Sequence, residues 1–269
     1  MSMDRLFDLP IYRTHLWIFN SYAVVEDGRA ALVDVGLPSI GEAVLDGLAA
    51  HDVNPSQLRA LLCTHAHPDH VGGMPRVLER AVIDTFFPAR CERYLAGERP
   101  RRFGLNDAVK FLPVWGEERF SLKAAHEFAH AGMTIGFGGP KDLKLPFTPT
   151  GFLTDGTAPA GLTGWETIAA PGHTDDSTCF YHQDSATLLS GDAVVTLDGR
   201  AWFNPEWVDQ DLSAATEERL RSLEVRYLLP GHGKPIEGPD IWSSARSFRD
   251  RPDGSGLLAR CSRRLARWK

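Results

Sequence analysis

The sequence predicts a layered fold in which helices cover the faces of β-sheet, and three observations lead to this prediction. Residues 11–26 and 29–34 are rich in β-branched and aromatic side chains, and an Asp-Gly pair typical of β-hairpins joins them. Apolar residues then recur at helical spacing over residues 40–48. A short apolar run at 59–63 follows, so the order strand, helix, strand indicates helices packed on a sheet.

The second half of the chain repeats this alternation. Short apolar runs predict strands at 165–170, 178–182, 186–190 and 225–229. Between the last two, Leu212, Ala215, Leu220 and Leu223 form the apolar stripe of a predicted helix. Asp211 or Ser213 could cap this helix at its N-terminus.

The 269 residues are enough for one large core or for two closely joined halves. Residues 85–149 include a predicted helix at 122–131 but no obvious strand core, so we interpret this stretch as an insertion lying over the site. Residues 255–269 predict a basic helix with an apolar stripe. We expect that helix to dock on the body or on a second subunit, which would make a homodimer.

Composition and charge exclude several classes of function. The net charge is −6, and the body without its basic end, from residue 243 onward, carries −12, so no nucleic-acid partner is expected. No apolar run approaches the roughly 18 residues of a membrane span. The first residues include acids rather than a secretory signal, and the cysteines form no CxxC pair. A cytoplasmic location is therefore expected.

The most informative segment is Thr64-His65-Ala66-His67-Pro68-Asp69-His70, directly after the run at 59–63. In extended backbone His65 and His67 point to the same side, whereas Asp69 and His70, entering a helix, lie on another side. This arrangement suits two adjacent metals better than one four-coordinate metal. Burying these groups without a cation would be costly.

Three more candidate ligands, His173, Asp192 and His232, also follow predicted strands closely. Ligands at strand ends can meet along one edge of a sheet, so we expect them to converge with His65. Imidazole and carboxylate ligands suit zinc, and they also suit iron or manganese.

A set of motifs in this order resembles that of the metallo-β-lactamase-fold hydrolases. The motifs are Asn20-Ser21-Tyr22, Val33-Asp34-Val35-Gly36, Thr64 to His70, Pro171-Gly172-His173-Thr174, Ser190-Gly191-Asp192 and Pro230-Gly231-His232-Gly233. The resemblance covers nearly the whole chain except the insertion and the basic end. It implies a single domain over residues 1–269 of the α+β class, a four-layer αββα sandwich of two mixed sheets faced by helices.

The same resemblance implies two metal ions per chain, two Zn²⁺ with iron or manganese as alternatives. The ligands that it implies are His65, His67 and His173 for the first ion, Asp69, His70 and His232 for the second, and Asp192 bridging both. Asp34 would orient a ligand without binding metal itself. Asp69 would also be catalytic, orienting the nucleophile or passing a proton to the leaving group.

The implied activity is hydrolysis of a small-molecule ester, lactone, thioester or amide by a metal-bound hydroxide. The chain lacks the Arg/Lys pattern after His232 that is typical of glyoxalase-II-type thioesterases, and the tyrosine just after Asp192 that is typical of lactonases. The substrate therefore stays open. Two alternatives share the fold. One is an iron-dependent oxidoreductase similar to persulfide dioxygenases. The other is a nuclease, which only the basic C-terminal helix supports.

A competing motif lies in the insertion. His126-Glu127-Phe128-Ala129-His130 matches the HExxH pattern of zinc proteases, on the predicted helix at 122–131. Met133 and Gly136 occupy the places where the metzincin extension has a glycine and a third histidine. We interpret the match as fortuitous for catalysis, and we expect His126 to reach the substrate pocket if the insertion folds over the metals.

The remaining expectations concern the substrate pocket. Trp202, Phe203 and Trp207 follow Asp192 closely, and we predict that they line the pocket mouth. The aromatic residues of the insertion could form an apolar lid, although packing within the insertion is favoured for most of them. These residues are Phe103, Phe111, Trp115, Phe120 and Phe147.

Overall fold

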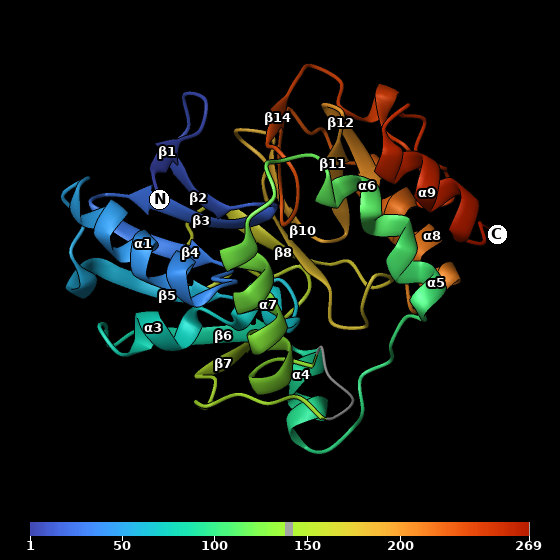
Figure 1. The fold of residues 1–269 in the computed structure, drawn as a ribbon. Helices are drawn as coiled ribbons and strands as arrows, with labels where there is room; N and C mark the ends of the chain where they lie inside the picture. The colour runs from blue at the N-terminus through green and yellow to red at the C-terminus, as the bar shows by residue number, and fades with distance from the viewer. Residues whose placement is uncertain (138–141, 269) are drawn as a thin grey trace.

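Two β-sheets packed face to face form the centre of the structure, a computed structural model that describes residues 1–137 and 142–268 (Figure 1). The first sheet follows chain order: β1 (Met3–Arg5), β2 (Ile11–Leu16), β3 (Phe19–Glu26), β4 (Arg29–Val33), β5 (Leu58–Leu62), β6 (Asp84–Pro88) and β7 (Gly151–Leu153). Neighbours from β1 to β4 are antiparallel, whereas β4 to β7 run parallel. The sheet is therefore mixed.

The second sheet is also mixed. Its order is β14 (Ile236–Glu237), β13 (Tyr227–Pro230), β10 (Thr187–Gly191), β9 (Thr178–His182) and β8 (Trp165–Ala169). Only β10 and β13 pair in parallel. A separate hairpin of β11 (Val194–Leu197) and β12 (Arg200–Phe203) follows β10.

Helices cover the outer faces of both sheets. The helices along the chain are α1 (Pro38–Ala49), α2 (Pro68–Val71), α3 (Met74–Leu78), α4 (Arg90–Leu95), α5 (Leu105–Ala108), α6 (Leu112–Trp115), α7 (Leu122–Thr134), α8 (Gln210–Arg221) and α9 (Leu257–Leu265). Short 3₁₀ turns are η1 (Pro55–Gln57), η2 (Val109–Phe111) and η3 (Trp242–Ser244). Apolar residues of α1 and α3 pack on the first sheet, and Leu220 of α8 packs on the second.

A third apolar cluster lies between the two sheets and includes Val24, Leu62, Phe180 and Leu229. The layers are thus helix, sheet, sheet, helix. This confirms the predicted α+β class and αββα sandwich, in which each sheet buries both faces.

Several local predictions need correction. Residues 11–26 form two strands rather than one, because a two-residue turn at Trp17 and Ile18 separates β2 from β3. Asp209 caps α8, and its side chain accepts hydrogen bonds from the backbone of Asp211 and Leu212, so the cap lies earlier than predicted. The hairpin of β11 and β12 was not predicted.

The predicted insertion also needs a boundary change. Residues 85–88 belong to β6, which pairs in parallel with β5 inside the first sheet. The rest includes helices α4 to α7, and α7 crosses in front of the junction between the two halves of the molecule (Figure 1). Residues 138–141 of the insertion and residue 269 of the predicted C-terminal helix lie outside the described residues.

The basic helix α9 docks on helix α6 and the 3₁₀ turn η2 of this insertion (Figure 1). The side chain of Asn106 accepts a hydrogen bond from the backbone of Arg267 at 2.8 Å. The buried ammonium of Lys110 lies 5.7 Å from the ring centre of Trp268. Among residues 1–137 and 142–268, no helix has the length and apolar content that crossing a membrane would require.

Candidate metal centre

The site begins where β5 ends and the chain turns into α2. Pro68 stands at the first position of α2, where its missing N–H costs nothing. His65 and His67 precede this helix in non-helical backbone, whereas Asp69 and His70 belong to its single turn. The first pair therefore comes from non-helical backbone and the second from a helical turn, and the ring centres of His65 and His70 nevertheless lie 4.0 Å apart.

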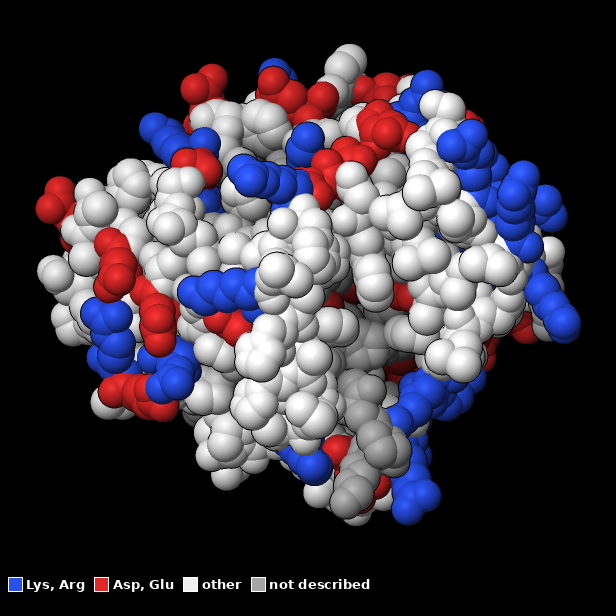
Figure 2. Space-filling model, in the orientation of Figure 1, with Lys and Arg blue, Asp and Glu red and all other residues white. Residues whose placement is uncertain are grey.

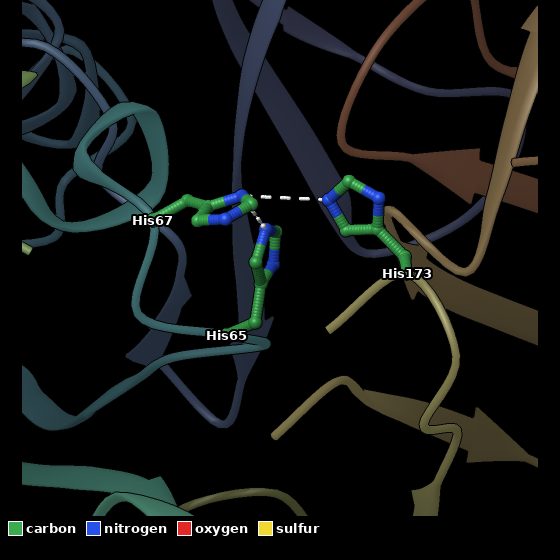
Figure 3. Close-up of side chains that lie close together, drawn as sticks. All are labelled: His65, His67 and His173. Atoms are coloured by element: carbon green, nitrogen blue, oxygen red, sulfur yellow. Dashed lines mark hydrogen bonds between the residues drawn. The ribbon is translucent and has the colours of Figure 1, made fainter. Parts of the chain in front are cut away.

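All seven predicted ligands lie together in the structure. Three overlapping groups have their ligand atoms within 4.8 Å of one another: His65, His67 and His173; His65, His70 and Asp192; and Asp69, His70 and His232. Figure 3 shows the first group, in which Nδ1 of His67 lies 3.0 Å from Nε2 of His65 and 3.4 Å from Nε2 of His173. Each of these groups could hold an ion, and the first and third share no residue.

Asp192 lies between the first of these groups, His65, His67 and His173, and the third, Asp69, His70 and His232. Its Oδ2 is 3.6 Å from Nε2 of His173, 3.9 Å from Nε2 of His65 and 3.2 Å from Nε2 of His232. Its Oδ1 faces His70, with 3.4 Å to Nε2. One carboxylate is thus within reach of both groups, which is the position of a bridging ligand.

Asp34 orients two of the histidines from outside the groups. Its Oδ2 accepts a hydrogen bond from Nδ1 of His70 at 2.8 Å and another from the hydroxyl of Thr64 at 2.7 Å. The same hydroxyl lies 3.3 Å from Nδ1 of His65, so it accepts from that ring. With both Nδ1 atoms donating, Nε2 of His65 and His70 carries the lone pair in the neutral rings.

Backbone carbonyls orient two further histidines in the same way. Nδ1 of His173 donates to the carbonyl of Glu206 at 2.9 Å, and Nδ1 of His232 donates to the carbonyl of Ile18 at 3.2 Å. Both Nε2 atoms therefore face Asp192. Fixed tautomers of this kind are typical of histidines that bind metals.

Burial lowers the pKa of some of these histidines, whereas nearby carboxylates raise the pKa of others. Burial lowers the pKa of His65 well below its usual range and that of His67 to about 3. Burial also acts on His232, but Asp192 and Asp69 raise its pKa to about 10. Asp192 and Asp34 likewise raise the pKa of His70 above its usual range, against the effect of burial. Without metal, protons therefore concentrate on His70 and His232, which belong to the group with Asp69.

The residues present fit a pair of cations. Nε2 of His70 and Oδ1 of Asp192 are fully buried and lie 3.4 Å apart, and neither forms a hydrogen bond with any described residue. Buried polar atoms without partners are rare, and a bound ion is a common explanation. Gly231 keeps this space open, because a Cβ there would collide with Oδ1 of Asp192 and Cε1 of His70.

A cavity of about 1060 Å³ opens onto the centre. Its wall includes His67, Asp69, His173, Asp192 and His232, so ligands of both groups face the same space. Figure 2 shows a hollow beside α7 with acidic side chains visible within it. A substrate in this cavity would contact both groups at once.

The predicted pocket residues do not belong to the described wall of this cavity. Trp202 and Phe203 are 0% and 2% exposed, because β12 turns them into the hydrophobic core. Trp207 packs beside the ammonium of Lys110, at 5.0 Å from its ring centre. His126 lies on the exposed side of α7, whereas Ala125 and Phe128 of that helix line the cavity. The expectation for these four residues is therefore corrected.

Other residues take their place. Four of the five insertion aromatics, Phe103, Phe111, Trp115 and Phe120, line the cavity, whereas Phe147 packs against Phe87. Several residues of the wall were not predicted from the sequence, notably Trp17, Phe19, Phe137, Glu206 and Leu258. Glu206 directly precedes Trp207, and burial together with Asp192 raises its pKa well above the usual range. Its position directly before Trp207, in the segment predicted to line the pocket mouth, is the sequence signal that could have identified it.

The HExxH run has a structural explanation. Oε2 of Glu127 accepts hydrogen bonds from the backbone N–H and the hydroxyl of Ser39, at 3.1 and 2.8 Å, at the start of α1. His126 and His130 are exposed, and within the described residues they belong to no group with metal-ligand geometry. Glu127 thus joins α7 to α1 rather than serving a metal.

Comparisons with known proteins agree with the fold and the motifs. "Probable metallo-hydrolase YflN" of Bacillus subtilis (strain 168) is 25% identical over 236 residues, which cover 82% of this chain and 81% of that protein. A hydroxyacylglutathione hydrolase of Parasynechococcus marenigrum (strain WH8102) is 41% identical over 153 residues, 56% of this chain and 55% of that protein.

A solved structure, the metallo-beta-lactamase family protein TTHA1429 from Thermus thermophilus, has a TM-score of 0.57 and 22% identity, and the match covers 87% of this chain and 76% of that chain. This similarity supports the fold. The sequence pattern of the metallo-beta-lactamase superfamily matches residues 17–232, from the β2–β3 turn to the last candidate ligand. Because this match spans most of the chain, the protein belongs to the metallo-beta-lactamase superfamily.

Proposed function

We propose that this chain is a dinuclear metal-dependent hydrolase that cleaves a small ester, lactone, thioester or amide. The observation that carries the proposal is the position of Asp192 between two groups of ligand atoms that share no residue. The relative YflN, named a probable metallo-hydrolase, and the hydroxyacylglutathione hydrolase are consistent with hydrolysis.

The geometry supports the proposed ligands. His65, His67 and His173 would hold one ion, Asp69, His70 and His232 the other, and Asp192 both. When bound, two divalent cations lower the pKa of a coordinated water toward about 7 and polarise the substrate carbonyl. Zinc suits this set of nitrogen and oxygen ligands, as do iron and manganese.

Asp69 is the proposed catalytic residue. Its Oδ2 lies 3.1 Å from Nε2 of His232, and the same side chain lines the cavity. Its pKa is lowered to about 2, because hydrogen bonding to His232 and the neighbouring imidazoles outweigh burial. Asp69 is therefore ionised at neutral pH in the metal-free protein, and in the proposed enzyme it would orient a water, accept its proton and deliver that proton to the leaving group.

The proposed reaction balances without a further reactant. Water adds its oxygen to the carbonyl carbon, and the bond from that carbon to the leaving oxygen, sulfur or nitrogen breaks. The proton taken by Asp69 ends on the leaving group, and the products are an acid and an alcohol, thiol or amine. Asp34 contributes by fixing the rings of His65 and His70 in place.

The test combines metal analysis with a substrate panel. Protein loaded with zinc, manganese or iron is assayed on lactone, thioester, ester, phosphodiester and β-lactam substrates. Hydrolysis of a carboxylic ester, lactone, thioester or amide that is lost in Asp69→Asn supports the proposal, and metal content is measured beside activity because Asp69 is also a proposed ligand. Iron content with oxygen consumption, and no hydrolysis, would favour the oxidoreductase of this fold instead.

A further inference from the structure

The cavity is much larger and more apolar than hydrolysis at the metal centre requires. Its volume of about 1060 Å³ is at the upper end of small-molecule sites, roughly 300–1,000 Å³. Water, a carbonyl and a leaving atom would occupy only the floor of such a space. The remaining wall must therefore recognise some other part of the substrate.

Aromatic rings surround the centre directly. The ring of Phe111 lies 5.3 Å from that of His232, and Phe19 lies 5.4 Å from the same ring. Phe103 is 5.3 Å from His173. These rings leave an apolar surface on the substrate side of the ligands, which favours a substrate whose group beside the carbonyl is apolar.

A continuous line of aromatic contacts leads from this inner ring to the surface. Trp17 contacts Phe19 at 5.8 Å between ring centres, Trp115 at 5.9 Å and Phe120 at 5.0 Å. At the outer end Trp115 is 40% exposed and Phe120 57%. Large apolar side chains grouped at the mouth of a cavity are typical of ligand sites, because a bound apolar group covers them.

The wall is held in shape by contacts between distant segments. The indole N–H of Trp17 donates to the backbone carbonyl of Trp115 at 3.0 Å, which joins the β2–β3 turn to α6. Trp17 itself has φ +57°, an uncommon conformation for a bulky residue. The docked helix α9 adds Leu258 to the wall. A cavity braced in this way is preformed and loses little entropy on binding.

The charged side chains of the wall away from the metal centre, Arg101, Arg102 and Glu118, are already engaged within the protein. Arg101 donates to Asp175 at 2.9 Å and to Asp209 at 2.8 Å. Glu118 accepts from Arg13 at 2.7 Å. Arg102, the other cation of the wall, also has a partner. The wall therefore favours an uncharged group over one that carries carboxylates.

We infer that the substrate carries a long, uncharged, apolar acyl group that extends from the metal centre along Phe19 and Trp17 toward the rim. This inference rests on the proposed hydrolase function, and it assigns the apolar wall to the acyl side of the scissile bond. It names the substrate class as esters, thioesters or lactones of medium- to long-chain acids.

The experiment uses a series of thioesters with one leaving group and acyl chains from acetyl through hexanoyl to decanoyl, on the zinc-loaded protein. The expected result is a rise in kcat/KM of roughly two- to fourfold for each added methylene until the cavity is filled. Equal values along the series, or a maximum at acetyl, would overturn the inference while leaving the hydrolase function intact.

A binding measurement separates this inference from the proposed function. Methyl ketones of increasing chain length carry a carbonyl but no leaving group, and Trp17 and Trp115 report their binding through tryptophan fluorescence. Tighter binding of 2-undecanone than of 2-butanone supports the apolar site even if no thioester is cleaved. Equal or undetectable binding of both ketones overturns it.

Matched variants locate the site. Ala125→Trp fills part of the cavity and should remove most of the chain-length dependence, lowering the value for decanoyl by roughly tenfold. His130→Trp, on the exposed side of α7 away from the cavity, should leave the series unchanged. Leu258→Ala should likewise weaken binding of 2-undecanone, and its neighbour Leu257→Ala, outside the wall, should not. If the two variants of each pair changed the measured values equally, the placement of the acyl group in this cavity would be refuted.

Discussion

Nδ1 of His70 lies 2.8 Å from Oδ2 of Asp34, and this one hydrogen bond joins the end of β4 to the turn of α2. Asp34 adopts φ +53°, a left-handed conformation that aspartate and asparagine tolerate better than most residues. The carboxylate also accepts from the backbone N–H of Thr64 at 2.8 Å. Asp34 therefore couples the position of two neighbouring segments of the centre.

Asp34→Asn should weaken metal binding without removing a ligand. Asparagine keeps the backbone conformation but replaces one acceptor oxygen by an amide, so His70, Thr64 or both lose a hydrogen bond. Loss of such an orienting partner typically costs 10- to 100-fold in metal affinity. Competition titration against a chromogenic chelator measures it, and an unchanged Kd for both ions would contradict the role given to Asp34.

Glu127 tests the HExxH run as a structural feature. Glu127→Ala removes both hydrogen bonds to Ser39 at the start of α1, and we expect it to lower the free energy of unfolding by about 1–2 kcal/mol. Urea denaturation measures this change. Metal content should stay at the wild-type value in Glu127→Ala and in His126→Ala. Loss of an ion from His126→Ala would instead revive the zinc-protease interpretation.

Metal binding should release protons from His70 and His232, two of the three proposed ligands of the second ion. In the metal-free protein the raised pKa values of His70 and His232 keep these rings protonated at neutral pH, and a metal must displace those protons. The lowered pKa values of His65 and His67 leave the first group unprotonated. Affinity of the second site should therefore fall as the pH drops, by about tenfold per pH unit for each displaced proton.

Two readouts check this pH dependence. An indicator dye in weak buffer records acid released when zinc is added to metal-free protein. Titrations between pH 8 and pH 6 should show the second ion lost before the first. Zinc uptake with no release of acid, or both ions weakening in parallel, would contradict the proposed division of ligands.

Much of the centre could be predicted from sequence because its residues lie in short motifs at strand ends. The run from His65 to His70 and the isolated His173 and His232 each follow an apolar strand, and the layered fold brings those strand ends together. Metal ligands are also restricted to a few residue types. The convergence of these side chains could therefore be inferred without any knowledge of loop conformation.

The cavity wall could not be predicted in the same way. Its apolar side chains come from the β2–β3 turn, the segment between α4 and α7, α7 itself and the C-terminal α9, and no local pattern signals that these segments meet. Closeness to Asp192 in sequence suggested Trp202 and Phe203, but the hairpin of β11 and β12 carries both into the core. Apolar side chains that line a site and those that fill a core have the same composition.

The most direct test of the account is the metal content of purified wild-type protein and of Asp192→Ala. Elemental analysis should find two divalent ions per wild-type chain, one for each of the two separate ligand groups. Asp192→Ala should lose one or both ions together with nearly all hydrolysis. Wild-type protein that is fully active with no bound ion, or an Asp192→Ala variant with unchanged metal content, would contradict the central claim that this carboxylate bridges a metal pair.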